Sequence, residues 1–255
     1  MTASPSSLVP RRAALSVTAA VGLTACSRTA SAQSLGTRPV GHVVLLGDSI
    51  FDNAGYLRGS GPDVVAQLRR QLPSGWQATL LARGGSVAAE VPGQLARLAP
   101  DATHLVVSAG GNDAGRRESV LAEPARSVAD GLARIAALRE SFEQDYQAML
   151  DVLLKRGLPA AVCTVYDPRF PEPGRRRVAV VALAAFNDVI TRGAFVQGTA
   201  LIDLRLICSE DRDFAGPTGP SVRGGEKIAA AIANWAAGQR PRRGRSEVIS
   251  GNESG

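Results

Sequence analysis

Ser49 is the residue whose type and place best suit chemistry in this chain. It follows Asp48 and the apolar run Val43–Gly47, so it stands where a buried strand is expected to end and a turn to begin. A serine at such a turn can be presented above a parallel sheet as a nucleophile. Asp48 and Ser49 can also simply cap a following helix, since both residue types favour that position.

Two further turns follow apolar runs and carry residue types that suit the same chemistry. Gly84 and Gly85 stand in the second turn, and Asn112 and Asp113 follow two glycines in the third. Glycine lets the backbone approach a ligand closely, and asparagine supplies an uncharged N–H donor. The amides of Ser49 and Gly85 and the side chain of Asn112 can therefore converge on an oxygen that gains charge during acyl transfer. Each residue alone can also be an ordinary turn or cap residue.

The elements that must position these turns read as an α/β fold. Short apolar runs alternate with segments of helical spacing, which favours a five-stranded parallel sheet covered on both faces, a three-layer α/β/α sandwich. The expected strands are His42–Leu46, Gln77–Leu81, His104–Ser108, Ala160–Val165 and Ala200–Asp203. The expected helices are Pro62–Gln71, Ala88–Leu98, Ser127–Lys155, Arg177–Gly193 and Arg223–Ala237.

In such open sheets ligands bind beyond the carboxyl ends of the strands, where Ser49, Gly85 and Asn112 are expected. The two histidines, His42 and His104, stand instead at strand starts, at the opposite edge. The chain thus offers a nucleophile without an evident imidazole to activate it. No phosphate-binding glycine-rich loop follows the first strand, which argues against a nucleotide or flavin site.

Composition bounds the domain count and the partners. A chain of 255 residues, 45% of them hydrophobic, fits one α/β domain, here residues 41–238. No apolar run appears long enough to span a bilayer, and no ligand cluster predicts a metal or other cofactor. Much of the net charge of +6 lies in Arg175–Arg177 and in the tail 239–255, which we expect to be disordered. Without interleaved aromatic residues this charge does not predict a nucleic-acid partner.

Residues 1–40 read as an export signal followed by a flexible tether. Arg11 and Arg12 precede a short apolar segment, and Leu23–Cys26 has the pattern of a bacterial lipobox, in which Cys26 would carry the lipid and anchor the chain to a membrane. A rival cleavage point follows Ala32, and an unstructured extension remains open. We expect a protein of the cell envelope or a secreted one.

Export would place the domain in an oxidising compartment. Cys163 and Cys208 would then be available for pairing, since each stands near the end of an expected strand. The sequence leaves a disulfide and two ordinary buried thiols equally open, because it does not show whether their Cα atoms come close enough.

Taken together, the three turns resemble the blocks of the SGNH/GDSL hydrolase family, over residues 43 to 237. Gly47-Asp48-Ser49 matches the block with the nucleophile, Gly85 (or Gly84) the oxyanion-hole glycine, and Gly110-Gly111-Asn112-Asp113 the block with the oxyanion-hole asparagine. The resemblance implies a flavodoxin-like α/β/α sandwich. It also implies an esterase or lipase that forms an acyl-enzyme at Ser49. Asp48 and Asp113 are expected to line the substrate site.

The fourth block of that family, Asp-x-x-His, is not matched. Aligned on Pro220-Ser221, its aspartate and histidine positions hold Gly216 and Gly219, and neither can transfer a proton. We therefore expect a monomer that turns over a lipid or carbohydrate ester slowly, and we expect Gly219→His to raise the rate. Four acidic residues could act as a base in place of the histidine, namely Asp167, Glu210, Asp211 and Asp213. We interpret them instead as solvated loop residues. A non-catalytic domain that binds a glycan or an acyl group is the alternative.

Overall fold

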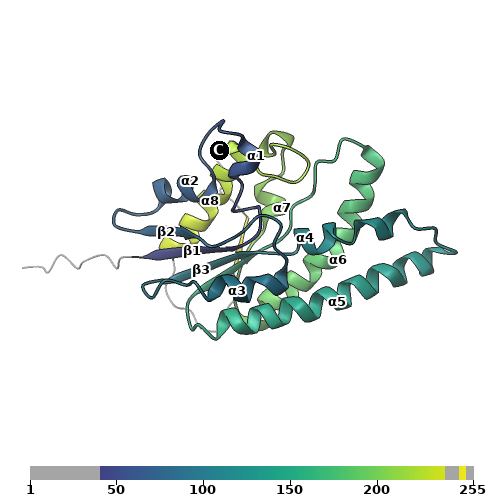
Figure 1. Ribbon diagram of the computed structural model, residues 1–255, viewed down its shortest axis with the longest axis horizontal. Helices are drawn as coiled ribbons and strands as arrows, with labels where there is room; N and C mark the ends of the chain where they lie inside the picture. Colours follow the sequence, from purple (N-terminus) through teal and green to yellow (C-terminus); the bar gives the residue numbers. More distant parts are fainter. Residues whose placement is uncertain (1–40, 239–246, 251–255) are drawn as a thin grey trace, which may run out of the picture. The chain divides into compact units, whose positions relative to one another are not determined.

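Six apolar segments form the sheet of the computed structural model, which describes residues 41–238 and 247–250 (Figure 1). All six strands are parallel and lie in the order β2-β1-β3-β4-β5-β6. Their bounds are β1 His42–Gly47, β2 Gln77–Leu80, β3 His104–Ser108, β4 Ala160–Cys163, β5 Ala200–Ile202 and β6 Val248–Ile249. Because β1, β2 and β3 are neighbours, the turns that follow them open at one edge of the sheet.

Helices and short turns of 3₁₀ helix connect the strands. Their bounds are α1 Ala54–Leu57, α2 Val64–Gln71, η1 Ala88–Glu90, α3 Val91–Leu95, α4 Gly111–Gly115, η2 Glu118–Ala122, α5 Val128–Leu154, α6 Pro173–Gln197, α7 Leu204–Ile207, η3 Asp211–Asp213 and α8 Val222–Gly238. Four of the five expected helices are present as single helices, and the fifth, Ala88–Leu98, is divided into the 3₁₀ turn η1 and the short helix α3. The largest difference is at α6, which begins at a proline suited to the first helical turn and ends at Gly198 in the left-handed region.

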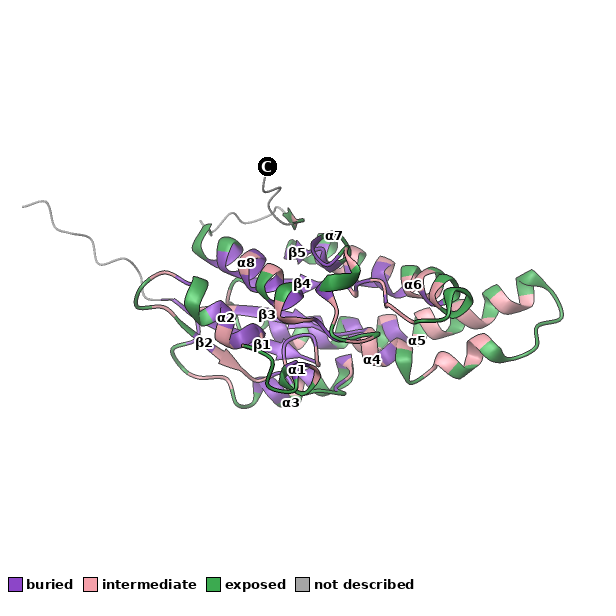
Figure 2. Ribbon diagram, turned by 90° about the horizontal axis from the view of Figure 1, so that it is seen from above, coloured by how far each residue is buried: buried purple, intermediate pink, exposed green. Residues whose placement is uncertain are grey.

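The sheet is buried on both faces, which explains why its strands are apolar at successive positions. Val43 and Leu45 of β1 belong to the core under α2 and α8, whereas Val44 and Leu46 belong to the core under α3, α5 and α6. The helices lie on opposite sides of the strands in Figure 1, and the central strands β1 and β3 are coloured mostly as buried in Figure 2, whereas the edge strand β2 is mostly intermediate. The predicted three-layer α/β/α sandwich is confirmed.

The sheet has one strand more than the sequence analysis predicts. Val248 and Ile249 pair in parallel with Leu201 and Ile202, and the amide of Leu201 donates to the Glu247 carbonyl oxygen at 2.7 Å. The prediction of disorder is therefore wrong for this part of the tail. Residues 1–40, 239–246 and 251–255 lie outside the described residues, and with them the predicted export signal and Cys26.

Helix α6 is long and apolar enough to cross a membrane by length and composition, so the sequence-based statement that no apolar segment reaches that length is wrong. The helix nevertheless contributes Phe186, Val189 and Ile190 to the core shared with α5 and β4. One face of the helix therefore serves the domain core, whereas Val178, Val181, Phe195 and Val196 are exposed. Together with α5 it covers the sheet face that borders the site described next.

Candidate active site

A glycine at the end of β1 sets the direction in which Ser49 leaves the sheet. Gly47 has φ +111°, and a Cβ at this position would lie 1.7 Å from the carbonyl oxygen of Ser108 on β3. Only glycine tolerates both the backbone angle and this approach. The amide of Asp48 then donates to the same carbonyl at 3.1 Å, so the turn that carries Ser49 is fixed to the neighbouring strand.

Ser49 opens onto a pocket with a volume of about 360 Å³. Part of the lining comes from the turns after β1, β3 and β4, including Asp48, Asn112 and Tyr166. A second part is an apolar lining from η2, α5 and α6. It comprises Leu121, Ile135, Leu138, Ala179, Ala182, Leu183 and Phe186. The half-buried nucleophile candidate therefore faces a site that joins polar groups to an apolar surface.

The turn after β2 lies beside Ser49, as predicted. A Cβ on Gly84 would lie 3.8 Å from Cβ of Ser49, and the Gly84 amide donates to Oδ2 of Asp52 at 2.8 Å. Because that donor is engaged, Gly85 remains the better of the two for an incoming oxyanion. Gly85 has φ +83° and its carbonyl accepts from Arg116, but it is not among the pocket-lining residues.

The turn after β3 brings Asn112 into the same pocket. Gly110, with φ +126°, leads into α4, and the Asn112 side chain donates to the Ser86 carbonyl oxygen at 2.9 Å. A carboxamide has two N–H donors, so one remains for a ligand. The structure thus brings together the three turns singled out in the sequence, while the oxyanion-hole roles of Ser49, Gly85 and Asn112 stay predictions.

The two aspartates next to these residues are buried and differ in place. Asp48 lines the pocket and accepts from the Ile50 amide at 3.0 Å; burial, with the nearby Asp113 charge, raises its pKa to about 7. Asp113 instead accepts from the Ala88 amide at 3.2 Å, and burial also raises its pKa. The Asp113 carboxylate therefore points to η1, and Asp113 is not among the residues that line the pocket. Its predicted contact with the substrate is left without support.

Tyr56, which the sequence analysis did not single out, lies against Ser49. Its hydroxyl donates to Oγ of Ser49 at 3.3 Å. Its ring lies over Gly219, where an added Cβ would be 2.3 Å from Cγ of Tyr56. The ring occupies the space that a side chain at position 219 needs, which argues against a gain in activity from Gly219→His alone; that gain stays a prediction. At Gly216 an added Cβ would meet no atom within 4 Å.

Both histidines lie at the opposite edge of the sheet, as predicted. His42 begins β1, whose five residue steps to Gly47 span about 17 Å. Its ring contacts Thr79 at 2.8 Å and Asp101 at 3.1 Å. His104 begins β3, and burial lowers its pKa. The imidazoles are thus separated from Ser49 by the length of the strands.

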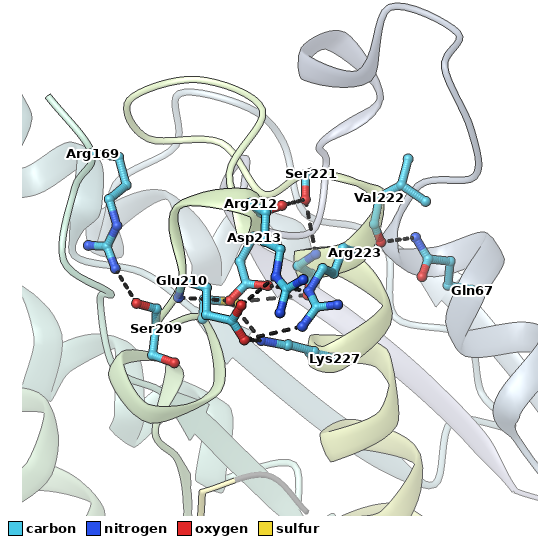
Figure 3. A network of polar contacts seen from close by, with 12 residues as sticks. Gln67, Arg169, Ser209, Glu210, Arg212, Asp213, Ser221, Val222, Arg223 and Lys227 are labelled. Carbon is cyan, nitrogen blue, oxygen red and sulfur yellow. Dashed lines mark hydrogen bonds and ion pairs between the residues drawn. The ribbon is translucent and has the colours of Figure 1, made fainter. Parts of the chain in front are cut away.

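Three of the four acidic residues considered as substitute bases, Glu210, Asp211 and Asp213, are held by cations. Figure 3 shows Asp213 and Glu210 within a cluster of basic side chains at the start of α8. Asp213 is fully buried and accepts from Lys227 at 2.8 Å and from Arg223 at 3.2 Å. Hydrogen bonds from Arg212, with the charges around it, lower the pKa of Glu210 to about 2.

Asp211 pairs with Arg169 at 2.9 Å, and Asp167 is not among the pocket-lining residues. Among the described residues, none of the hydrogen bonds and ion pairs of these acids reaches Ser49. The two cysteines in the described part of the chain, Cys163 and Cys208, are buried and unpaired, so the possible disulfide is not formed. Burial raises the pKa of Cys208 to about 12 and that of Cys163 well above its usual range.

The GDSL-like lipase/acylhydrolase family model matches residues 45–225, which include all three turns. None of the curated protein sequences compared with this chain matches it.

The fold is similar to those of several solved enzymes. An extracellular lipase from Streptomyces rimosus is 19% identical with a TM-score of 0.56, over 77% of this chain and 100% of the other. The phospholipase A1 from Streptomyces albidoflavus is 18% identical with a TM-score of 0.58, over 77% and 99%. The carbohydrate acetylesterase Est24 from Sinorhizobium meliloti is 12% identical with a TM-score of 0.54, over 77% and 98%. By the extent of the family match and its shared fold, this chain belongs to the GDSL-like lipase/acylhydrolase family.

Proposed function

We propose that this protein is an exported serine esterase in which Ser49 attacks an ester carbonyl and forms an acyl-enzyme. The backbone amides of Ser49 and Gly85 and the free N–H of Asn112 would stabilise the oxyanion. The observation that carries the proposal is that Ser49 and Asn112 line one pocket, while the turn that holds Gly84 and Gly85 lies beside Ser49. Loss of one such donor typically costs about 10² to 10³ in rate.

Replacement of the nucleophile tests this proposal. Ser49→Ala is expected to abolish release of the alcohol from an aryl ester and labelling by a fluorophosphonate, which reacts with activated serine hydroxyls. The matched control is Ser74→Ala, because Ser74 is exposed in the loop before β2, at the opposite edge of the sheet. Equal activity of the Ser49 variant and the unmodified protein would remove Ser49 from the mechanism.

The apolar lining bears on the substrate. Leu121 of η2, Leu138 of α5 and Leu183 of α6 share one pocket with Ser49. Burial of apolar surface stabilises a bound hydrocarbon chain by about 25 cal/mol per Å². We therefore propose esters with an acyl chain longer than acetyl as substrates, and higher kcat/KM for an octanoate than for an acetate of the same alcohol. The reverse order would favour a small acyl group on a carbohydrate.

The same pocket also supports a second candidate, a non-catalytic domain that binds an acyl or glycan ligand. The glycines at positions 216 and 219 favour it, as do the ion pairs that hold Asp211 and Asp213. Fluorophosphonate labelling separates the two candidates. No labelling of Ser49 at any pH, combined with saturable binding of a fatty acid, would establish the binding domain.

We further propose that the chain is exported and lipid-anchored at Cys26. The support is the sequence pattern of residues 11–26, with paired arginines, an apolar segment and a lipobox-like end. In bacteria grown with a labelled fatty acid, the protein is expected to carry the label in the membrane fraction, and Cys26→Ser is expected to remove it. Label retained by this variant would refute lipidation at this cysteine.

A further inference from the structure

Tyr56 is held against Ser49 by the segment around α1. The preceding Asn53 is fully buried; its side chain donates to the Pro220 carbonyl at 3.2 Å and accepts from the Val64 amide at 2.9 Å. The Tyr56 amide in turn donates to the Asn53 carbonyl at 3.0 Å. These bonds tie the α1 turn both to α2 and to the segment before α8. The phenol is therefore placed by the fold rather than by a free loop.

The place that Tyr56 fills is created by Gly219. A Cβ at position 219 would approach Cγ, Cδ1 and Cδ2 of Tyr56 to within 2.3 to 2.6 Å, closer than Cβ contacts occur in proteins. The ring and any side chain at 219 therefore exclude each other. The same residue that removes the expected histidine makes room for a phenol, whose oxygen reaches Oγ of Ser49.

Other titratable and charged groups that line the pocket are engaged elsewhere. Asp48 accepts from the Ile50 amide, the Tyr166 hydroxyl donates to the Thr218 carbonyl at 2.6 Å, and Glu118 pairs with Arg175 at 2.7 Å. Arg117, also in the lining, donates to the Asp113 carbonyl at 3.2 Å. Among the described residues, Tyr56 is the one titratable side chain with a hydrogen bond to Ser49 Oγ.

We propose that Tyr56 is the general base of this site and acts as its phenolate. This inference rests on the proposed esterase function. In the resting state the phenol donates to Ser49; once the phenol has lost its proton, the direction of the hydrogen bond reverses and Ser49 donates to Tyr56. A phenol keeps its proton at neutral pH, unlike an imidazole. The role of Tyr56 is therefore tested by rates in alkaline solution, where a phenol gives up its proton.

The proton balance of the reaction closes with this one group. The phenolate takes the Ser49 proton, Oγ forms a bond to the ester carbonyl carbon, and the π electrons move onto the carbonyl oxygen. When this intermediate collapses, the bond to the leaving alkoxide breaks and Tyr56 protonates that alkoxide. Water then gives a proton to Tyr56 while its oxygen attacks the acyl carbon, and Ser49 leaves and recovers the proton from Tyr56. The acid and the alcohol are the products.

The test is the pH dependence of fluorophosphonate labelling and of aryl ester hydrolysis, from about pH 7 to about pH 11. General base catalysis contributes about 10² to 10⁴ in rate. Tyr56→Phe keeps the ring and is expected to lower the alkaline rates at least 10²-fold and to abolish the alkaline rise. Tyr146→Phe is the matched control, since it removes a phenol that is buried in the core and does not line the pocket; it is expected to keep the rise.

The outcomes separate the two proposals. If Ser49→Ala stays as active as the unmodified protein, the esterase proposal fails. If Ser49→Ala is inactive but folded Tyr56→Phe keeps the alkaline rise, only the assignment of Tyr56 is overturned. Loss of the rise in Tyr56→Phe but not in Tyr146→Phe supports the assignment, because a purely structural role of the ring would be preserved by phenylalanine.

Discussion

Replacing the phenol by an imidazole at the same place is the sharpest test of how the site is built. Gly219→His alone forces a Cβ to within 2.3 Å of the Tyr56 ring. Overpacking of this kind costs about 1–3 kcal/mol, and the imidazole cannot take the space beside Ser49. We expect this single variant to be less stable than the unmodified protein and no more active at pH 7.

The double variant Tyr56→Ala/Gly219→His removes the ring and opens that space. A histidine with its pKa near neutrality is a better base than a phenol at pH 7, and general base catalysis is worth about 10² to 10⁴. We expect kcat/KM for an aryl ester to rise about 10²-fold over the unmodified protein. Adding Gly216→Asp, where an added Cβ meets no atom within 4 Å, is expected to raise it further by orienting the imidazole.

The assay is ester hydrolysis at pH 7 with each variant, together with its thermal unfolding. Tyr56→Ala alone serves as the control for loss of the ring and is expected to show no gain. If Gly219→His alone were as active and as stable as the double variant, Tyr56 would not occupy the histidine place. If a folded double variant showed no gain, position 219 would not face Ser49.

Three further predictions concern stability and selectivity. Burial raises the pKa of Asp48 to about 7, so the native state binds more protons than the unfolded chain between about pH 4 and pH 7 and loses stability as the pH rises. Urea unfolding at pH 4 and pH 8 should show that Asp48→Asn removes up to about 4 kcal/mol of this loss of stability. The same pH dependence of stability in the variant and the unmodified protein would contradict this prediction. Ala182→Phe narrows the apolar part of the pocket and should lower kcat/KM for an octanoate at least 10-fold without lowering it for an acetate. Its control is Ala184→Phe, at an exposed position of the same helix, which should change kcat/KM for neither ester. Gly47→Ala should lower the free energy of unfolding in urea by about 3 kcal/mol, since its Cβ would meet the Ser108 carbonyl. Gly75→Ala, where φ is +85° but the surrounding space is open, should lower it by about 1 kcal/mol. Equal losses of stability would mean that the contact with β3 does not matter.

The sheet and its helices follow from local sequence signals. The run from Val43 to Leu46 is apolar at every position because both of its faces are covered, and the same holds for β3 and β4. The two-residue strand β6 carries no comparable signal. Val248 and Ile249 follow an arginine-rich segment, and they become a strand only because the edge of β5 offers them hydrogen bonds.

Some residues of the candidate site could also be predicted from the sequence, and others could not. Ser49, Gly85 and Asn112 stand in turns with recognisable neighbours, so their meeting could be predicted from the sequence. Tyr56 could not, because it belongs to no motif. Its contact with Ser49 depends on the path of the loop before α8, which brings Gly219 under the ring. A glycine at the position where the family motif has histidine therefore does not show which other side chain fills the space beside Ser49.

Strand β6 has a consequence for the integrity of the sheet. A chain cut after Gly238 would retain every helix of the described residues but would open the outer edge of β5, where the amides of Leu201 and Asp203 now donate to the carbonyl oxygens of Glu247 and Ile249. Open strand edges recruit strands from other molecules. Strand β6 thus covers an edge through which the domain could self-associate. The shortest form of the domain expected not to aggregate extends at least to Ser250.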